Sequence, residues 1–243
     1  MSEKSETQVA FSTSQIYKYY FDLAQMFSGR GLKILKTDSH NESGVYPQSI
    51  PLMPVLSRGN HAQCVEIDEI ILGLAKLNYP ELRFMLGDIR ALTVDGGFDV
   101  VLDFSTIDHV SRGEVEQVLR EYRRVAAFSS IIVWHSDSRQ DSVDQTYIPR
   151  QDFIQKIAQV FGSEAISVLL YSDRDRELVH YLVGAGPVAE IVSEVIDLGK
   201  WSRTANKEHA ALWRLKTSLV VQMALKISPI RALLTLVYRK LST

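Results

Sequence analysis

Several residue types that mark particular protein classes are scarce in this sequence. A single cysteine, Cys64, excludes an internal disulfide framework and a cluster of thiolate metal ligands. Cys64 lies in an apolar segment, so we interpret it as a core thiol. Residues 1–12 lack an apolar signal-peptide core, and no run approaches the roughly 18 apolar residues of a membrane-spanning helix. We therefore expect a cytoplasmic protein.

The histidines also lack the pattern of a metal site. No two of them fall at metal-ligand spacing on one predicted helix or strand, so we expect no bound metal. The six are His40, His61, His109, His135, His180 and His209.

Composition indicates a globular domain with an unusual end. Apolar residues make up 46% of the 243 residues, which is enough to bury the core of one full α/β domain and leave an appendage. The net charge of -2 conceals an uneven distribution, because residues 201–243 contain eight Lys or Arg and one acid. This basic end has a different physical role from the acidic remainder.

Alternating apolar and helical segments predict seven strands. The first five are separated by helices, whereas the last two are joined by the five polar residues 173–177. So short a connection forms a hairpin but cannot hold a crossover helix. We predict an α/β fold with a doubly wound, seven-stranded, mostly parallel sheet that ends in an antiparallel hairpin. The strands are expected at 32–37, 62–67, 82–86, 98–104, 129–135, 165–172 and 178–183, and the helices at 14–27, 49–56, 68–77, 113–126 and 150–161.

Four of the predicted strands end on a carboxylate, namely Asp38, Asp68, Asp88 and Asp103. Parallel strands end at the same edge of a sheet, which is where open α/β sheets bind ligands. These acids are therefore candidate ligand-binding residues. The glycine-rich turn expected after the first strand is missing, since the segment 35–44 contains only Gly44.

This order of elements resembles the class I S-adenosylmethionine-dependent methyltransferases over about residues 14–186. The segment 64–69 resembles their ribose-binding motif, which implies Glu66, with Asp68 second, as acceptor for the ribose hydroxyls. The turn 86–89 resembles their adenine-binding turn, which implies that Asp88 accepts from the amine and Ile89 covers the ring. The resemblance implies S-adenosylmethionine (SAM) as donor and a Rossmann-like domain at 13–187, between a flexible terminus at 1–12 and a helical basic appendage at 188–243.

Residues 98–110 resemble the family segment in which the sulfonium of the donor faces the acceptor. This implies catalytic candidates at Asp108 and His109, and a donor contact at Asp103, for which a purely structural role is the alternative. An imidazole accepts a hydroxyl proton at neutral pH, so His109 is the first candidate for the general base. The alternative for His109 is a helix-start histidine bonded to backbone. His135, after the fifth strand, is the second candidate for the base.

The first motif departs from the family pattern. Typical members have a glycine-rich turn that lets the backbone approach the methionine part of the donor. Here Lys36-Thr37-Asp38 is followed by Glu42, which resembles bacterial methyltransferases that modify sugars and small molecules. This resemblance implies that Asp38 and Glu42 bind the ammonium group of the donor. We predict methyl transfer to a hydroxyl of a small molecule or of a cell-surface or lipid-linked glycan; the alternative is a non-catalytic scaffold at a membrane surface.

The basic end combines charge with an apolar stripe. Leucines and other apolar residues recur at helical spacing from Leu212 to Ile227, and Ser228 and Pro229 then supply the N-cap and first turn of a second helix. These helices suit the interface of an anionic membrane, such as the inner face of the cell membrane, and packing on the domain or in a homodimer is the alternative. Nucleic acid is not expected, because the aromatic residues do not alternate with the basic ones.

Overall fold

The computed structural model describes residues 3–45, 49–139, 141, 145–163, 165–172, 175–184 and 191–200, with side chains from Gln15 onward. The predicted basic helices at 201–243 lie outside the described residues, so their association with a membrane or a second copy stays a prediction. None of the helices in the described ranges is long and apolar enough to cross a membrane.

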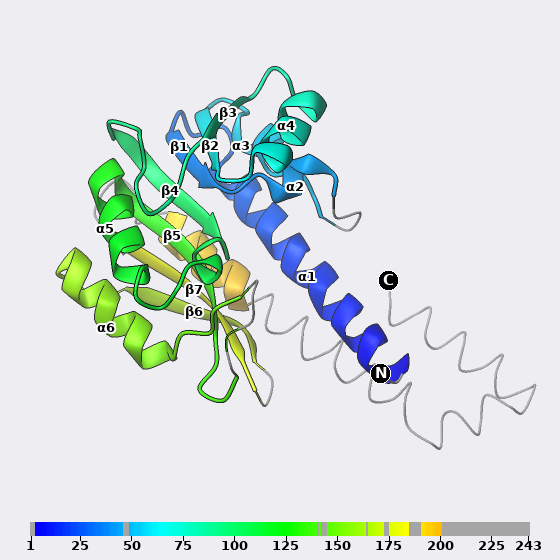
Figure 1. Ribbon diagram of the computed structural model, residues 1–243, viewed down its shortest axis with the longest axis vertical. Helices are drawn as coiled ribbons and strands as arrows, with labels where there is room; N and C mark the ends of the chain where they lie inside the picture. Colours follow the sequence, from blue (N-terminus) through cyan, green and yellow to red (C-terminus); the bar gives the residue numbers. More distant parts are fainter. Residues whose placement is uncertain are drawn as a thin grey trace, which may run out of the picture. The chain divides into compact units, whose positions relative to one another are not determined.

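Seven strands form one sheet in the order β3-β2-β1-β4-β5-β7-β6 (Figure 1). All neighbours are parallel as far as β5, whereas β7 pairs antiparallel with both β5 and β6. The predicted fold class is therefore confirmed, including the terminal hairpin. The strands are β1 (Lys33–Thr37), β2 (His61–Glu66), β3 (Arg83–Leu86), β4 (Phe98–Phe104), β5 (Ala126–His135), β6 (Ile166–Ser172) and β7 (Glu177–Gly184).

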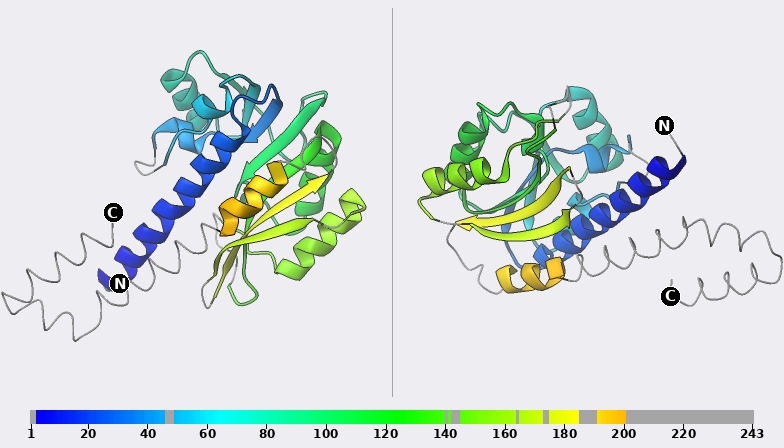
Figure 2. Two further views of the ribbon diagram at one scale, coloured as in Figure 1. Left: turned by 180° about the vertical axis from the view of Figure 1, so that it is seen from behind. Right: turned by 90° about the horizontal axis from the view of Figure 1, so that it is seen from below.

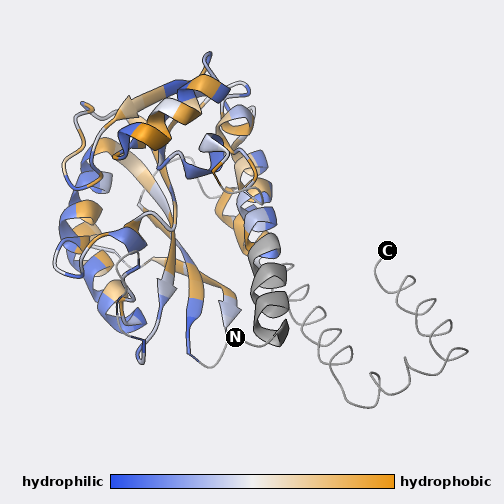
Figure 3. Ribbon diagram, turned by 45° about the vertical axis from the view of Figure 1, so that its right-hand side comes forward, coloured by the Kyte–Doolittle hydropathy of each residue, from blue (hydrophilic) through white to orange (hydrophobic). Residues whose placement is uncertain are grey.

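Neighbouring residues of the central strands face opposite sides of the sheet. Ile34 belongs to one buried apolar cluster and Leu35 to the other, and Cys64 and Val65 divide in the same way. The sheet is thus covered on both faces, which explains why its strands are nearly continuous apolar runs. Figure 3 shows this as hydrophobic strands between helices that are hydrophobic on one side. Cys64 is fully buried, as expected of a core thiol.

The helices divide between the two faces. The part of α1 from Ile16 to Phe27 and the helix at 191–200 cover one face, and α5 and α6 cover the other (Figures 1 and 2). Val195 is fully buried in the first cluster, and the helix that carries it belongs to the compact unit Ile16–Arg203. The helices are α1 (Glu3–Phe27), α2 (His40–Ser43), α3 (Met53–Leu56), α4 (Glu69–Asn78), η1 (Ile107–His109), α5 (Val115–Val125) and α6 (Arg150–Phe161).

Two helices differ from the sequence prediction. The helix expected from residue 14 begins at Glu3, in a stretch free of glycine and proline. The helix expected at 49–56 is reduced to α3, because Pro51 has no amide proton to donate and Pro54 is accepted only in the first turn.

Candidate active site

A pocket of about 120 Å³ opens at the carboxyl edge of the parallel strands. Asp38 follows β1, residues 65–67 end β2, residues 87–90 follow β3, and Thr106, His109 and Val110 follow β4. The sheet order reverses between β1 and β4, so this is the switch point at which open α/β sheets bind ligands. This pocket thus lies at the predicted location of the site.

Asp38 has the backbone conformation that a glycine would otherwise supply. Its φ is 56°, and Ser105, directly after β4, has a φ of 69°; no other non-glycine residue in the described ranges has a positive φ. Aspartate tolerates the left-handed region better than most side chains. The loop therefore turns sharply after β1 without glycine, and it carries a carboxylate at the turn.

A buried ion pair between Lys36 and Glu42 supports this turn from the protein interior. The Lys36 Nζ donates to the backbone oxygen of Asp38 at 2.6 Å and to Glu42 Oε2 at 3.2 Å, and neither the Lys36 nor the Glu42 side chain is exposed. Burial alone would lower the pKa of Lys36, but the charges of Asp38 and Glu42 outweigh it and hold the pKa above its ordinary value. The ammonium group thus stays charged inside the protein.

Glu42 has a structural position and does not line the pocket. Its Oε1 accepts from the backbone amides of Leu52 and Met53, both at 2.8 Å, and so fixes the start of α3. With Lys36 on the other oxygen, the carboxylate has no face open to a ligand. The geometry argues against the predicted contact between Glu42 and the ammonium group of the donor, whereas Asp38, the other predicted contact, lines the pocket.

The carboxylate of Asp38 joins the ends of β1 and β4. Its Oδ2 accepts from Thr106 Oγ1 at 2.6 Å, and Thr106 Oγ1 in turn accepts from Thr37 Oγ1 at 2.7 Å. Its Oδ1 accepts from the amide of His40 at 3.2 Å. Asp38 and Thr106 both line the pocket, so this network fixes the carboxylate at the pocket wall.

Glu66 lines the pocket with one acceptor position to spare. Its Oε2 accepts from the Ser39 amide at 2.6 Å and from Ser39 Oγ at 3.0 Å, and its Oε1 accepts from the Asp68 amide at 3.0 Å. A carboxylate can accept about four hydrogen bonds, so Glu66 can accept one more from a ribose hydroxyl. Asp68 itself caps α4 through the amides of Ile70 and Ile71 and is not a pocket residue.

Asp88 is held ionised and in a fixed orientation. The Arg90 side chain donates to both of its oxygens, with Nη2 at 2.6 Å from Oδ2, and the Arg90 amide donates to Oδ1 at 2.8 Å. The hydrogen bonds from Arg90 lower the pKa of Asp88 below its usual range. Gly87, just before it, has no room for a side chain, since a Cβ would lie 2.9 Å from Val65 Cγ2.

Apolar residues complete this part of the pocket. Ile89 is buried at the pocket, as predicted for a residue that covers a ring. Ile67, which is 59% exposed, also lines the pocket, although it was not among the predicted site residues. An isoleucine directly after the acid that ends a strand is the signal that identifies it. Two apolar side chains near two carboxylates suit an aromatic ring with polar edges.

Asp103 lies beneath the site and supports the turn after β4. It is buried, and it accepts from Tyr122 Oη and the Thr106 amide, both at 2.6 Å, and from the Ile107 amide at 3.1 Å. Burial raises the pKa of Asp103 to about 7. Its contacts match the structural alternative considered for it.

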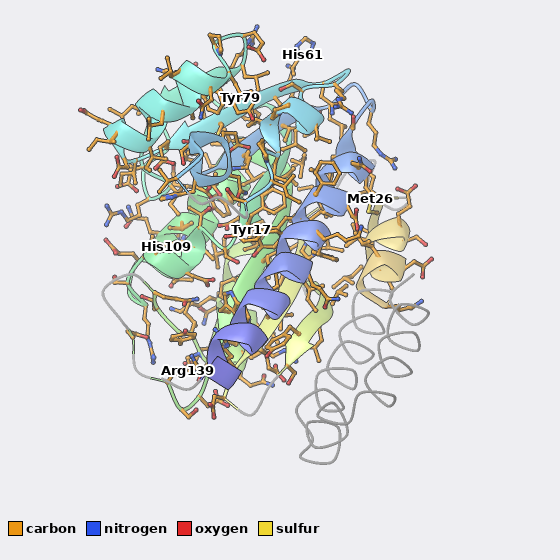
Figure 4. The ribbon with its side chains drawn as sticks, turned by 90° about the vertical axis from the view of Figure 1, so that its right-hand side faces the viewer. Tyr17, Met26, His61, Tyr79, His109 and Arg139 are labelled. Atoms are coloured by element: carbon orange, nitrogen blue, oxygen red, sulfur yellow. The ribbon has the colours of Figure 1, made fainter. Side chains whose placement is uncertain are left out.

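Of the three catalytic candidates, His109 alone lines the pocket. It is exposed, and Figure 4 labels it beside the segment that follows β4. Asp108 is fully buried and accepts from the Trp134 amide at 3.2 Å, and burial raises its pKa well above the usual range. The side chain of Asp108 therefore points into the protein and away from the pocket that His109 lines.

His135 is a core residue. Its Nδ1 lies 2.8 Å from the Ile148 backbone oxygen, to which it donates, and its Nε2 accepts from Tyr181 Oη at 2.8 Å. Burial lowers the pKa of His135 to about 4. With both nitrogens bonded, the ring has neither access nor a free position for a substrate proton, so the geometry argues against the predicted second base. Among the described ranges, no group of three or more His, Cys, Asp or Glu side chains can hold a metal ion.

Comparison with known proteins agrees with this geometry. A family model for a methyltransferase domain matches residues 48–133. No curated protein matches the sequence. Among solved structures, a TehB-like SAM-dependent methyltransferase from Corynebacterium glutamicum is 18% identical, with 69% of this chain and 88% of that chain covered and a TM-score of 0.50.

Two further structures are similar in fold. Magnesium protoporphyrin IX methyltransferase from Synechocystis PCC 6803, with bound SAM, is 14% identical over 75% of this chain and 85% of that chain, with a TM-score of 0.53. The N-terminal domain of EvdMO1, in the presence of SAH and D-fucose, is 16% identical over 71% of this chain and 83% of that chain, with a TM-score of 0.53. The chain thus has the fold of class I SAM-dependent methyltransferases, and its residues 48–133 match the model of a methyltransferase domain.

Proposed function

We propose that the pocket binds SAM and that His109 removes the proton from an acceptor hydroxyl during methyl transfer. The observation that carries the proposal is the position of His109, an exposed imidazole on the wall of a pocket that also presents Glu66 and Asp88. The bound donor supplies a sulfonium methyl group that an oxygen nucleophile can attack in line. The protein then has to position the two partners and accept one proton.

The nucleoside part of the donor fits the residues present. Glu66 retains one acceptor position for a ribose hydroxyl, and the ionised Asp88 can accept from an exocyclic amine. Ile67 and Ile89 supply the apolar contacts for the ring. All four residues lie on one pocket and come from the ends of two adjacent parallel strands.

Asp38 is the residue through which this chain holds the amino-acid part of the donor. Its carboxylate lies on the pocket wall, and a carboxylate attracts an ammonium group where a glycine-rich turn would offer only backbone. Lys36 Nζ lies 3.5 Å from Asp38 Oδ1 and 3.2 Å from Glu42 Oε2, so one ammonium group faces two carboxylates and the cluster keeps a net negative charge for a cationic ligand.

A sugar hydroxyl is the acceptor that we propose. The fold similarity to the EvdMO1 domain, a structure determined with D-fucose, supports this class of acceptor. The excess of basic residues at 201–243 supports a site of action at an anionic membrane surface, where lipid-linked glycans are built. Flotation with anionic liposomes, with and without residues 201–243, tests the second point; equal flotation of both forms would refute it.

A second candidate function is a non-catalytic binding partner. The observation that favours it is the turn after β1, where the Asp38 side chain occupies the position of a glycine and Glu42 is withdrawn from the pocket. A donor that needs open backbone at this point would be obstructed.

Calorimetric titration of SAM into the full chain distinguishes the two. We expect saturable binding, with S-adenosylhomocysteine competing for the same site. An Asp88→Asn variant serves as the matched control, because it keeps the shape of the side chain and removes its charge, and we expect weaker binding. Absence of binding at millimolar SAM would overturn the enzyme function and leave the scaffold.

A further inference from the structure

Arg90 connects two parts of the pocket that come from different strands. Its guanidinium donates to Asp88 through Nε and Nη2, and its Nη1 donates to Glu114 Oε1 at 2.7 Å. Asp88 follows β3, whereas Glu114 immediately precedes α5. The planar side chain of Arg90 therefore joins Asp88, the expected donor contact, to Glu114 at the start of α5.

Glu114 carries the connection into the segment that follows β4. Its Oε2 accepts from Ser111 Oγ at 2.8 Å and from the Ser111 amide at 3.2 Å. Ser111 lies two residues after His109 and directly after Val110, both of which line the pocket. From Asp88 to the His109 segment there is thus one unbroken series of charged and polar hydrogen bonds.

A third contact strengthens the connection at the backbone. Gln117, in the first turn of α5, donates from Nε2 to the backbone oxygen of Arg90 at 2.7 Å. Both the side chain and the main chain of Arg90 are therefore attached to the beginning of α5. A change in the position of Asp88 cannot leave this helix end unaffected.

We propose that Arg90 is a positioning residue, which couples donor binding at Asp88 to the placement of the segment that carries His109. This proposal rests on the proposed function, because it assigns a consequence to donor binding. Arginine suits the task, since its planar fork holds two carboxylates at once in fixed directions, which a lysine cannot do. When a ligand binds to Asp88, the position of this carboxylate becomes fixed. The guanidinium that bonds it then fixes the positions of Glu114 and, through Glu114, of Ser111.

The partial exposure of these groups makes the proposal testable by substitution. The side chains of Arg90, Asp88 and Glu114 are 35%, 31% and 36% exposed, so their removal should not unfold the protein. Arg120 is the matched control, because it pairs with Glu116 on the same helix α5 and does not line the pocket.

The experiment compares Arg90→Met, Glu114→Gln and Arg120→Met in the full chain. We expect Arg90→Met to weaken SAM binding by about tenfold in calorimetry, because Asp88 loses its fixed orientation. We expect Glu114→Gln to bind SAM nearly as the parent does but to lower kcat, since only the connection to the His109 segment is cut. Arg120→Met should match the parent in both.

Hydrogen exchange supplies a readout that does not depend on turnover. Without any ligand, the amides of residues 107–111 should exchange faster in Arg90→Met than in the parent, and SAM should slow them in the parent only. If Arg90→Met matches Arg120→Met in binding and in exchange, the coupling is refuted. If the parent fails to bind SAM, the proposed function is refuted, and the ligand-free exchange still decides whether Arg90 holds this segment.

Discussion

The two halves of the pocket achieve a defined shape by different means. At the ends of β2 and β3, the pocket wall is formed by Gly87, which has a valine side chain close to its Cα, and by the carboxylates of Glu66 and Asp88. After β1, the shape comes from the buried pair of Lys36 and Glu42 and from Asp38 in a left-handed conformation. At the ends of β2 and β3, the shape depends on a glycine without a side chain. After β1, it depends on a buried ion pair that supports the turn.

The comparison shows that the turn after β1 can form without a glycine-rich motif. The backbone still reverses after β1 because the ammonium group of Lys36 bonds the Asp38 carbonyl from below. The chain therefore keeps the turn and gains a carboxylate at the pocket, at the cost of a buried charge that has to stay paired. Substitutions in the two halves should accordingly have different kinds of effect.

The largest effect on stability is expected at Glu42. Glu42→Ala leaves the Lys36 ammonium buried without its partner and the amides of Leu52 and Met53 without an acceptor. We expect a loss of about 3–5 kcal/mol in the free energy of unfolding, measured by urea denaturation. Glu69→Ala, at an exposed site in α4, is the control. Equal effects of the two substitutions would contradict a structural role for the buried pair.

The largest effect on activity is expected at His109. His109→Gln should lower kcat by about a hundredfold or more, because the acceptor hydroxyl loses its base, and should leave the dissociation constant of SAM unchanged. The measurement is methyl transfer from labelled SAM to sugar acceptors, together with calorimetry. His61→Gln is the control, since Figure 4 shows His61 remote from His109 and it begins β2 at the opposite edge of the sheet. A His109→Gln enzyme with parental kcat would eliminate this base.

His135 should affect stability and its pH dependence instead. The native pKa of His135 is about 4, below the ordinary 6.5, so the unfolded chain takes up a proton that the native protein does not. Stability should therefore be greatest above pH 6.5 and fall as the pH decreases toward 4. His135→Gln should be less stable at pH 7 by about 1–3 kcal/mol and should lose less on acidification. An unchanged pH slope would contradict the buried, neutral ring.

The smallest effect is expected at Ile67. Ile67→Ser removes apolar contact from the pocket wall and should weaken SAM binding by at most about tenfold, without a change in stability. Ile70→Ser is the matched control, because Ile70 is 75% exposed and lies off the pocket. Equal SAM affinity of the two variants would show that Ile67 does not contact the donor.

The sequence predicted the strands, their parallel order and the acids at their ends well, because burial on both faces leaves long apolar runs that are hard to mistake. It predicted Glu66, Asp88 and Ile89 at the pocket for the same reason, since strand ends fix their positions. It could not separate Asp38 from Glu42, because the direction of a loop side chain depends on the amides of residues 52 and 53, which are distant in sequence. The sequence could not predict that His135 is buried, because its bonds to Ile148 and Tyr181 join residues that are distant in sequence.

We propose that the Asp38 side chain, at the turn after β1, binds the amino-acid part of SAM in place of the missing glycine-rich turn. Calorimetric titration of SAM into Asp38→Gly, beside the parent and Asp38→Asn, tests it most directly, because glycine accepts the φ of 56° while removing the carboxylate. We expect SAM affinity to fall by about tenfold or more in both variants. Equal or tighter SAM binding by Asp38→Gly would contradict it, because the side chain would then be an obstacle and not a ligand.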